Sequence, residues 1–276
     1  MNTDSEQQQP PPEILYKYRD WTGEFSKRSI ENLEVFFPSP RRFNDPFDCA
    51  IPPDPFTETE DETRARAARS VAQDMPDASR IEQRFETESR VERFKNSSRS
   101  PEIRKNISME TTRAMADEFG VLSLTTDPTS ILMWSYYADK HAGLCVGYDV
   151  RVLRETVNKV HETYALLKVK YQRDFPDLRP QDYSDTRDLV IDMLTIKAKD
   201  WEHEQEYRLI LDGRNDKPIS LPKSAIAEVI VGARMPQKHI DEVANILEGH
   251  DLSSTLRQAK LKEDEYAITI EQIPSE

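Results

Sequence analysis

The chain has 276 residues, and its 51 acidic and 38 basic side chains give a formal net charge of -13 at pH 7. So acidic a protein is a poor general binder of nucleic acid or anionic membranes, because both need a basic surface to neutralise phosphate. The two cysteines, Cys49 and Cys145, lack metal or redox spacing and suit a reducing compartment. No apolar run approaches the ~20 residues of a membrane span, and no secretory signal is visible. We therefore expect a cytoplasmic protein.

Helices and strands are predicted to intermix along one domain, residues 13–276, after a polar, Pro-rich tail over residues 1–12 that is predicted to be disordered. Before the insertion we predict strands over 14–19 and 35–37, with a helix over 26–34 between them. After it we predict a strand over 121–125, a helix from Asp127 to near Gly143, a strand over 144–148, a helix over 151–161 and a strand over 164–171. The rest of the chain is predicted to form a helix from Ser184, strands from about His203 and over 225–231, a helix over 237–248 and a final hairpin over 256–273. The order lacks a steady βαβ rhythm and several strands are close enough for hairpins. We therefore predict an α+β fold with a mainly antiparallel β-sheet, continuous or split, flanked by helices.

A helical insertion is predicted at about residues 57–119, which are rich in Glu, Arg, Ala and Ser. Thr59 and Glu62 have the spacing of a capping box. Ser100-Pro101 is typical of a second helix start, and Gly120 is the expected stop. The charge pattern favours a solvated surface, and the alternative is a surface for a protein partner or a gating element.

Two further stretches carry candidate site residues. The residue types of Asn44-Asp45-Pro46 favour a turn. Phe43 beside it suggests that this turn packs next to a cleft, and an ordinary tight loop is the alternative. Trp134, Tyr137 and His141 fall on one face of the predicted central helix. Such a stripe is typical of a core, and the alternative is the aromatic wall of a site.

The strand that follows His203 carries charges on one face, because side chains alternate along a strand. Glu204, Glu206 and Arg208 lie together on that face, although the strand continues into apolar residues. Buried charges persist only when they are paired or hydrogen-bonded. One interpretation is an exposed edge strand or a structural ion-pair network, and the other is the polar floor of a site.

Several common catalytic signatures are absent from the sequence. It has no glycine-rich phosphate loop, no nucleophile elbow and no His-Glu-x-x-His motif. The five histidines have no spacing that suggests a metal site. If the protein is an enzyme, its functional groups are therefore carboxylates, Arg or Lys side chains, and aromatic rings.

Four stretches together resemble the bacterial family known as domain of unknown function 2971, over nearly the whole chain from about residue 14. They are Leu15-Tyr16-Lys17-Tyr18-Arg19; Phe43-Asn44-Asp45-Pro46-Phe47-Asp48; Leu132-Met133-Trp134-Ser135-Tyr136-Tyr137-Ala138-Asp139 with His141 and Gly143; and Trp201, Glu204, Glu206 and Arg208. The family usually has His where this chain has Tyr136. Related proteins occur among abortive-infection and phage-defence genes, so the resemblance implies a defence or toxin effector.

The order of basic, aromatic and acidic residues along the chain is also similar, more distantly, to that of ADP-ribosyltransferases. This similarity implies NAD as a substrate. Glu206 would then stabilise the positive charge that develops on the ribose, and Glu204 would orient the acceptor. The implied substrate-binding residues are Lys17, Tyr18, Arg19, Phe43, Asn44, Asp45, Trp134, Tyr136, Tyr137, His141 and Arg208. No metal ligand and no further cofactor are implied.

Two other functions remain open. The protein is alternatively a non-catalytic module that binds a nucleotide or a peptide, or a metal-dependent nuclease effector of phage defence that uses its carboxylates. The enzymatic interpretation requires Lys17 and Arg19 on the first strand to face Glu204 and Glu206 across one hollow. Nothing in the linear sequence establishes that they meet.

Overall fold

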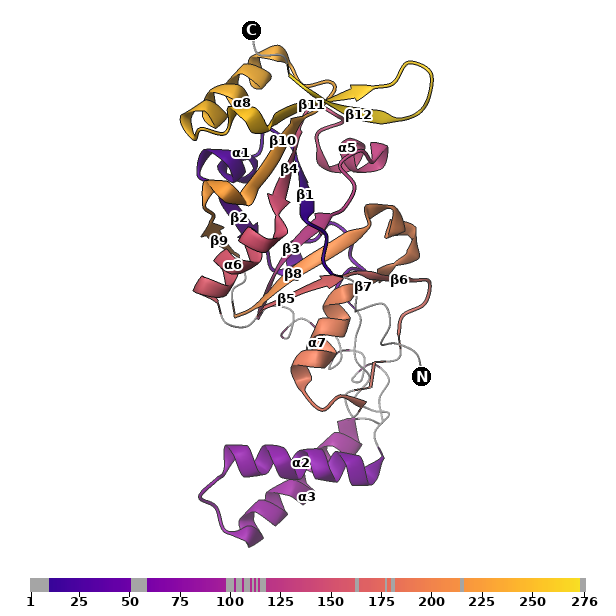
Figure 1. The fold of residues 1–276 in the computed structure, drawn as a ribbon. Coiled ribbons are helices and arrows are strands. Elements are labelled where there is room, and N and C mark those ends of the chain that lie inside the picture. The colour runs from indigo at the N-terminus through magenta and orange to yellow at the C-terminus, as the bar shows by residue number, and fades with distance from the viewer. Residues whose placement is uncertain are drawn as a thin grey trace. The chain divides into compact units, whose positions relative to one another are not determined.

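The computed structural model describes residues 10–50, 59–97, 102, 106, 110, 112, 114, 118–161, 164–176, 178, 179, 182–213 and 216–273 (Figure 1). The chain divides into two compact units. The sheet unit consists of Met1–Arg42, Glu118–Tyr171 and Ala198–Glu276, and the insertion unit consists of Phe43–Asp117 and Gln172–Lys197. The predicted tail over residues 1–12 lies almost entirely outside the described residues, as do Ser100 and Pro101.

The described elements are as follows. The α-helices are α1 (Glu24–Glu31), α2 (Glu60–Asp74), α3 (Arg80–Ser97), α5 (Ile131–Tyr137), α6 (Val150–Val160), α7 (Thr186–Thr195) and α8 (Gln237–Gly249); the 3-10 helices are η1 (Pro40–Arg42), η4 (Lys199–Glu204), η5 (Lys223–Ala225) and η6 (Ser253–Thr255); the strands are β1 (Ile14–Arg19), β2 (Glu34–Phe37), β3 (Phe119–Thr125), β4 (Leu144–Asp149), β5 (Tyr164–Lys168), β6 (Lys170–Gln172), β7 (Ile196–Ala198), β8 (Glu206–Asp212), β9 (Lys217–Ser220), β10 (Ile226–Val231), β11 (Leu256–Leu261) and β12 (Ile268–Gln272). None of the described helices has the length and apolar character needed to cross a membrane.

One large sheet organises the sheet unit. Its eight strands run in the order β12-β11-β10-β4-β1-β3-β8-β5, and two-stranded sheets pair β2 with β9 and β6 with β7. Every neighbouring pair in the large sheet is antiparallel except β10 and β11. The predicted α+β class with a mainly antiparallel sheet is therefore confirmed.

The two faces of the large sheet are covered differently. Helices α1, α6 and α8 pack on one face, over the main core, and α5 packs on the other (Figure 1). Helix α6 buries Val150, Leu153 and Val157, which share one side of a helix, against this core. Alternation along β1 sends Leu15 into the main core and Tyr18 into the smaller cluster under α5.

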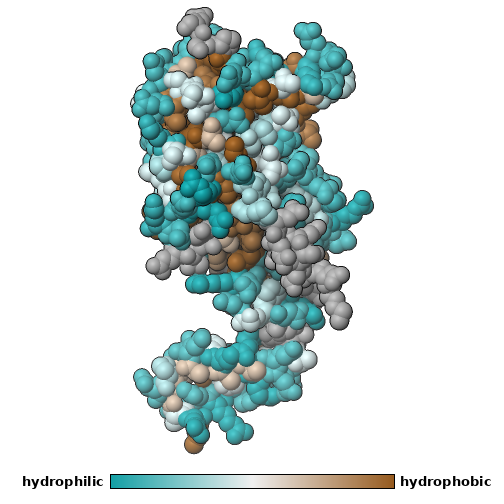
Figure 2. Space-filling view, viewed as in Figure 1, coloured by the Kyte–Doolittle hydropathy of each residue, from teal (hydrophilic) through white to brown (hydrophobic). Residues whose placement is uncertain are grey.

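The predicted capping box of Thr59 and Glu62 is confirmed. The Thr59 hydroxyl accepts a hydrogen bond from the Glu62 backbone N–H at 3.3 Å, and the Glu62 side chain accepts one from the Thr59 backbone N–H at 2.7 Å. This is the predicted capping box at the start of α2. In the face shown in Figure 2, α2 and α3 are mainly hydrophilic, although Ile81 and Phe85 on α3 are exposed.

The helix predicted to begin at Asp127 begins later and ends earlier. Ser130 is its N-cap, since the Ser130 hydroxyl accepts from the Met133 N–H at 3.3 Å. The Asp127 carboxylate instead accepts from the Thr129 N–H at 2.8 Å, which forms a local turn before the helix. Helix α5 ends at Tyr137, and His141 lies beyond it with a φ of 74°.

Other boundaries also move. Helix α1 begins before the predicted Ser26, and Phe119 with Gly120 belongs to β3 rather than to the insertion. The strand predicted over 164–171 is broken at Val169 into β5 and β6.

Candidate functional site

The stretch around Glu204 changes direction where a continuous strand was predicted. Residues Lys199–Glu204 form the 3-10 helix η4, and Gln205 then adopts a left-handed conformation with a φ of 45°. Strand β8 begins only at Glu206. The prediction that Glu204 shares a strand face with Glu206 and Arg208 is therefore wrong, because the chain turns at Gln205.

Glu206 and Arg208 do share a face of β8, and they form a buried ion pair. The Arg208 Nε donates to Glu206 Oε1 at 2.8 Å, and a terminal guanidinium nitrogen donates to Oε2 at 3.1 Å. The two residues are 3 % and 0 % exposed. Both carboxylate oxygens are thus held by one planar cation, the strongest pairing geometry for these groups. This arrangement favours the structural interpretation of the pair.

Glu204 is held by a different partner. The Tyr137 hydroxyl, at the end of α5, donates to Glu204 Oε1 at 2.7 Å. Glu204 is 4 % exposed. The fold therefore joins a mid-chain aromatic residue and a late glutamate that are 67 positions apart, although the carboxylate has little access to solvent.

The aromatic residues around Trp134 are mainly core. Trp134 is fully buried, donates from its indole N–H to the Pro128 carbonyl at 2.9 Å, and meets the Tyr18 ring edge-on at 5.1 Å. Tyr18 is also buried, and its hydroxyl donates to the Asp127 carbonyl at 2.8 Å. Tyr136, in contrast, is 63 % exposed on the outer side of α5.

His141 has a defined tautomer. The Ser135 hydroxyl donates to the Ile131 carbonyl at 2.7 Å, so its single proton is used. His141 Nε2, 3.1 Å from that hydroxyl oxygen, must therefore be the donor. His141 Nδ1 is then a lone-pair acceptor that is buried without a partner among the described residues. Burial, and secondarily the positive charge of Arg234, lowers the pKa of His141.

Lys17 and Arg19 face away from the Glu206 side chain. Tyr16 pairs with Thr125 on β3, and Thr125 pairs with Glu206 on β8. Directly paired residues project from the same face of a sheet, so Tyr16 shares a face with Glu206. Lys17 and Arg19 have the opposite parity and project from the other face. The expected hollow between Lys17, Arg19 and Glu206 is therefore not formed.

The Asn-Asp-Pro turn belongs to the insertion unit, where Phe43, Asn44 and Asp45 lie. The Asp45 carboxylate accepts from the Phe47 N–H at 2.9 Å, which is the predicted turn chemistry. Within the same unit, the Lys197 ammonium lies 3.5 Å from the carboxylate of Asp48, and both side chains are buried. These contacts stabilise the loop.

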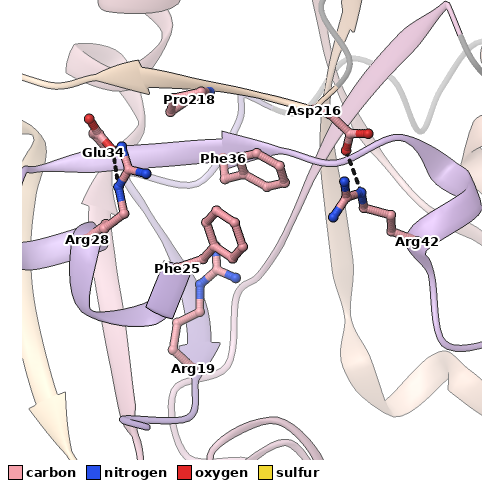
Figure 3. Close-up of a pocket in the computed structure, with 8 residues that line it drawn as sticks. All are labelled: Arg19, Phe25, Arg28, Glu34, Phe36, Arg42, Asp216 and Pro218. Atoms are coloured by element: carbon pink, nitrogen blue, oxygen red, sulfur yellow. Dashed lines mark hydrogen bonds and ion pairs between the residues drawn. The ribbon is translucent and has the colours of Figure 1, made fainter. Parts of the chain in front are cut away.

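Arg19 enters a pocket of about 210 Å³ on its own face of the sheet (Figure 3). The pocket is formed by the end of β1, α1, β2, η1, β9 and the residue before β9. Its lining residues are Arg19, Phe25, Arg28, Glu34, Phe36, Arg42, Asp216 and Pro218. The Arg28 guanidinium pairs with Glu34 at 2.7 Å, and the Arg42 guanidinium pairs with Asp216 at 2.8 Å. Three guanidinium groups therefore face two carboxylates.

Among the lining arginines, only Arg19 has a side chain that makes no hydrogen bond or ion pair to a described residue, and its Nε is inaccessible to solvent. Burial lowers the pKa of Arg19, and Tyr148 and Asp20 oppose this only in part. Because an arginine stays protonated in proteins, the pocket holds a partly buried cation whose charge the nearby Asp20 offsets only in part. A bound anion would remove this imbalance.

A second hollow is less suited to an anion. It has a volume of about 710 Å³ and lies beside α6 and the chain before β1. Its charged lining consists of Arg151, Arg154, Glu13, Asp149 and Glu155, so carboxylates outnumber guanidiniums. Arg154 also has an unpartnered buried Nε, but here the surrounding carboxylates already supply negative charge.

Phe25, Arg28, Phe36 and Arg42 were missed in the sequence, although Arg19 itself was predicted to bind substrate. They come from three different elements, α1, β2 and η1. The available signal was the density of aromatic and arginine residues between 25 and 42, which has no regular spacing.

Residues 133–209 match the family described as Protein of unknown function (DUF2971). The stretch similar to DUF2971 contains Trp134, Tyr137, His141 and the Glu204–Arg208 region. The Arg19 pocket and the Asn44 turn lie outside it. No curated protein and no solved structure matches the chain.

Metal chemistry has no visible centre in the described residues. They contain no group of three or more His, Cys, Asp or Glu side chains that could hold a metal ion.

Proposed function

We propose that this protein is a binding module for a small anionic ligand, which Arg19 holds in the pocket beside Phe25 and Phe36. The supporting observation is the Arg19 side chain, which lines the cavity with a buried Nε and makes no hydrogen bond or ion pair to a described residue. This choice corresponds to the non-catalytic alternative predicted from the sequence, with a small molecule rather than a peptide as ligand.

The physical basis is the cost of an isolated buried charge. Removing a charge from water without a partner is unfavourable, and a charge-assisted hydrogen bond restores much of the loss. The neighbouring arginines are already neutralised by Glu34 and Asp216. Arg19 is therefore the one lining arginine without an ion pair, although the whole chain carries -13.

Calorimetric titration with inorganic phosphate at constant ionic strength tests the proposal. Wild type should bind, and Arg19→Gln should weaken binding roughly 10- to 100-fold, the value of one hydrogen-bonded charge. Arg151→Gln is the matched control, because Arg151 is exposed on α6 and pairs with Glu155. Equal phosphate affinity in Arg19→Gln and wild type would contradict the proposal.

ADP-ribosyltransferase-like NAD chemistry is a second candidate, supported by the contact between Tyr137 and Glu204. In this version Glu204, rather than Glu206, is the charge-stabilising carboxylate, since Arg208 already holds both oxygens of Glu206. Release of nicotinamide from NAD by wild type, and its loss in Glu204→Gln, would support this chemistry. No release by wild type would rule it out. A defence or toxin role stays a prediction of the resemblance, and a protein partner on the insertion stays the alternative drawn from its charge pattern.

A further inference from the structure

The ring of Phe25 is an unusual feature of the Arg19 pocket. It is 49 % exposed, although it stacks on Phe36 with ring centroids 5.3 Å apart and planes inclined by 27°. Figure 3 shows the Arg19 guanidinium beside Phe25, with Phe36 on the other side of the ring. The Arg42 guanidinium lies 6.0 Å from the Phe36 ring. The pocket thus offers an aromatic surface next to its unpaired cation.

We propose that the ligand is a nucleoside monophosphate, with its phosphate on Arg19 and its base stacked on Phe25; this rests on the proposed function. An aromatic side chain attracts a planar ring by dispersion and by removal of apolar surface from water. Stacking is tolerant of base identity because every base has a π-face. The aromatic surface and the cation are close enough to act on one small molecule.

The charges around the pocket favour a single phosphate group. Only Arg19 lacks an anionic partner among the described lining residues, since Arg28 and Arg42 pair with Glu34 and Asp216. A second phosphate would meet these two carboxylates and would have to displace one of them. We therefore expect a monophosphate to bind at least as well as a triphosphate.

The volume of the pocket also favours a nucleoside monophosphate. At about 210 Å³ it is smaller than the ~300–1,000 Å³ of sites that enclose a drug-sized ligand. It can surround the phosphate and one side of a ring, and the rest of the ligand stays in solvent. A whole dinucleotide such as NAD does not fit inside it.

The experiment compares adenosine monophosphate, ribose 5-phosphate and inorganic phosphate on the full-length protein by calorimetry. Wild type should bind adenosine monophosphate roughly three- to tenfold more tightly than ribose 5-phosphate, the worth of one aromatic contact. Phe25→Leu should bring this ratio close to one. Tyr266→Leu, which removes a fully exposed ring elsewhere, should keep the wild-type ratio.

The outcomes separate the two proposals. Equal binding of adenosine monophosphate and ribose 5-phosphate by wild type would overturn the nucleotide assignment and leave anion binding intact. An undiminished ratio in Phe25→Leu would also overturn it. If wild type binds none of the three phosphates, the proposed function itself fails.

Discussion

At the scale of single residues, arginines with the same chemistry have opposite surroundings in this protein. Arg208 is buried against Glu206, whereas the Arg19 side chain lies in a pocket and makes no ion pair with a described residue. Removing one partner of a buried ion pair costs folding free energy, because the other charge is left buried and unpaired. Replacing a buried charge that has no counter-ion leaves no such unpaired partner behind. Replacing Arg208 should therefore lower the free energy of unfolding more than replacing Arg19.

Arg208→Met should lower the free energy of unfolding by about 3–5 kcal/mol, because it leaves Glu206 buried without the guanidinium that holds it. Urea unfolding followed by circular dichroism measures this. The double variant Glu206→Gln with Arg208→Met should lose less than Arg208→Met alone, and Arg19→Met should be no less stable than wild type. A single Arg208→Met variant as stable as wild type would refute the role of the pair.

His141 should make stability depend on pH. Its folded-state pKa is lowered, first by burial and then by Arg234. As pH falls through the ordinary value of about 6.5, the unfolded chain takes up a proton that the folded chain does not. Stability therefore falls on acidification until the lowered pKa is passed.

The comparison of wild type with His141→Gln isolates this effect, because the carboxylates titrate alike in both. Urea unfolding at pH 7.5, 6.5 and about 5.5 should show a steeper decline for wild type than for His141→Gln. Identical declines would mean that the proton on His141 has no link to folding.

At the scale of elements, the turn after α5 fixes the end of β1 that carries Arg19. A side-chain Cβ on Gly143 would lie 2.2 Å from the Arg19 carbonyl oxygen. The Gly143 N–H donates to the Ala138 carbonyl at 2.8 Å, and the His141 N–H donates to the Trp134 carbonyl at 3.1 Å. The stretch similar to DUF2971 thus contacts the pocket through the backbone of β1.

Gly143→Ala should destabilise the protein by about 1–3 kcal/mol, as overpacking against backbone does, and should weaken phosphate binding by moving Arg19. Thermal unfolding and the phosphate titration measure the two effects. Gly249→Ala is the matched control, since nothing lies within 4 Å of a Cβ there and alanine suits a helix better than glycine. Unchanged phosphate binding in Gly143→Ala would show that the turn after α5 does not position Arg19.

The sequence predicts elements better than it predicts how they face one another. Strand β1, helix α6 and the Thr59 capping box follow from local spacing, and the structure confirms them. The start of α5 was misplaced because Asp127 and Ser130 are both good caps, and tertiary packing decides between them. The opposite faces of Arg19 and Glu206 depend on the register of β1, β3 and β8, which is a long-range property that no local pattern encodes.

At the scale of the whole molecule, a small cationic pocket lies in a strongly acidic chain. The net charge of -13 disfavours polyanions, whose many phosphates meet the average surface. A single anionic group senses mainly the charges within about one Debye length, roughly 8 Å at physiological salt. All described pocket residues belong to the sheet unit, so the proposed site does not depend on the insertion unit.

The arginine Nε–H signals of the nitrogen-15-labelled protein test anion binding by Arg19 most directly. The Arg19 signal is assigned by its loss in Arg19→Lys, and phosphate is added at constant ionic strength. The Arg19 Nε–H should shift and saturate with the calorimetric affinity, whereas the Arg151 signal should stay in place. An Arg19 signal that does not move while phosphate binds, or no binding at all, would contradict the account.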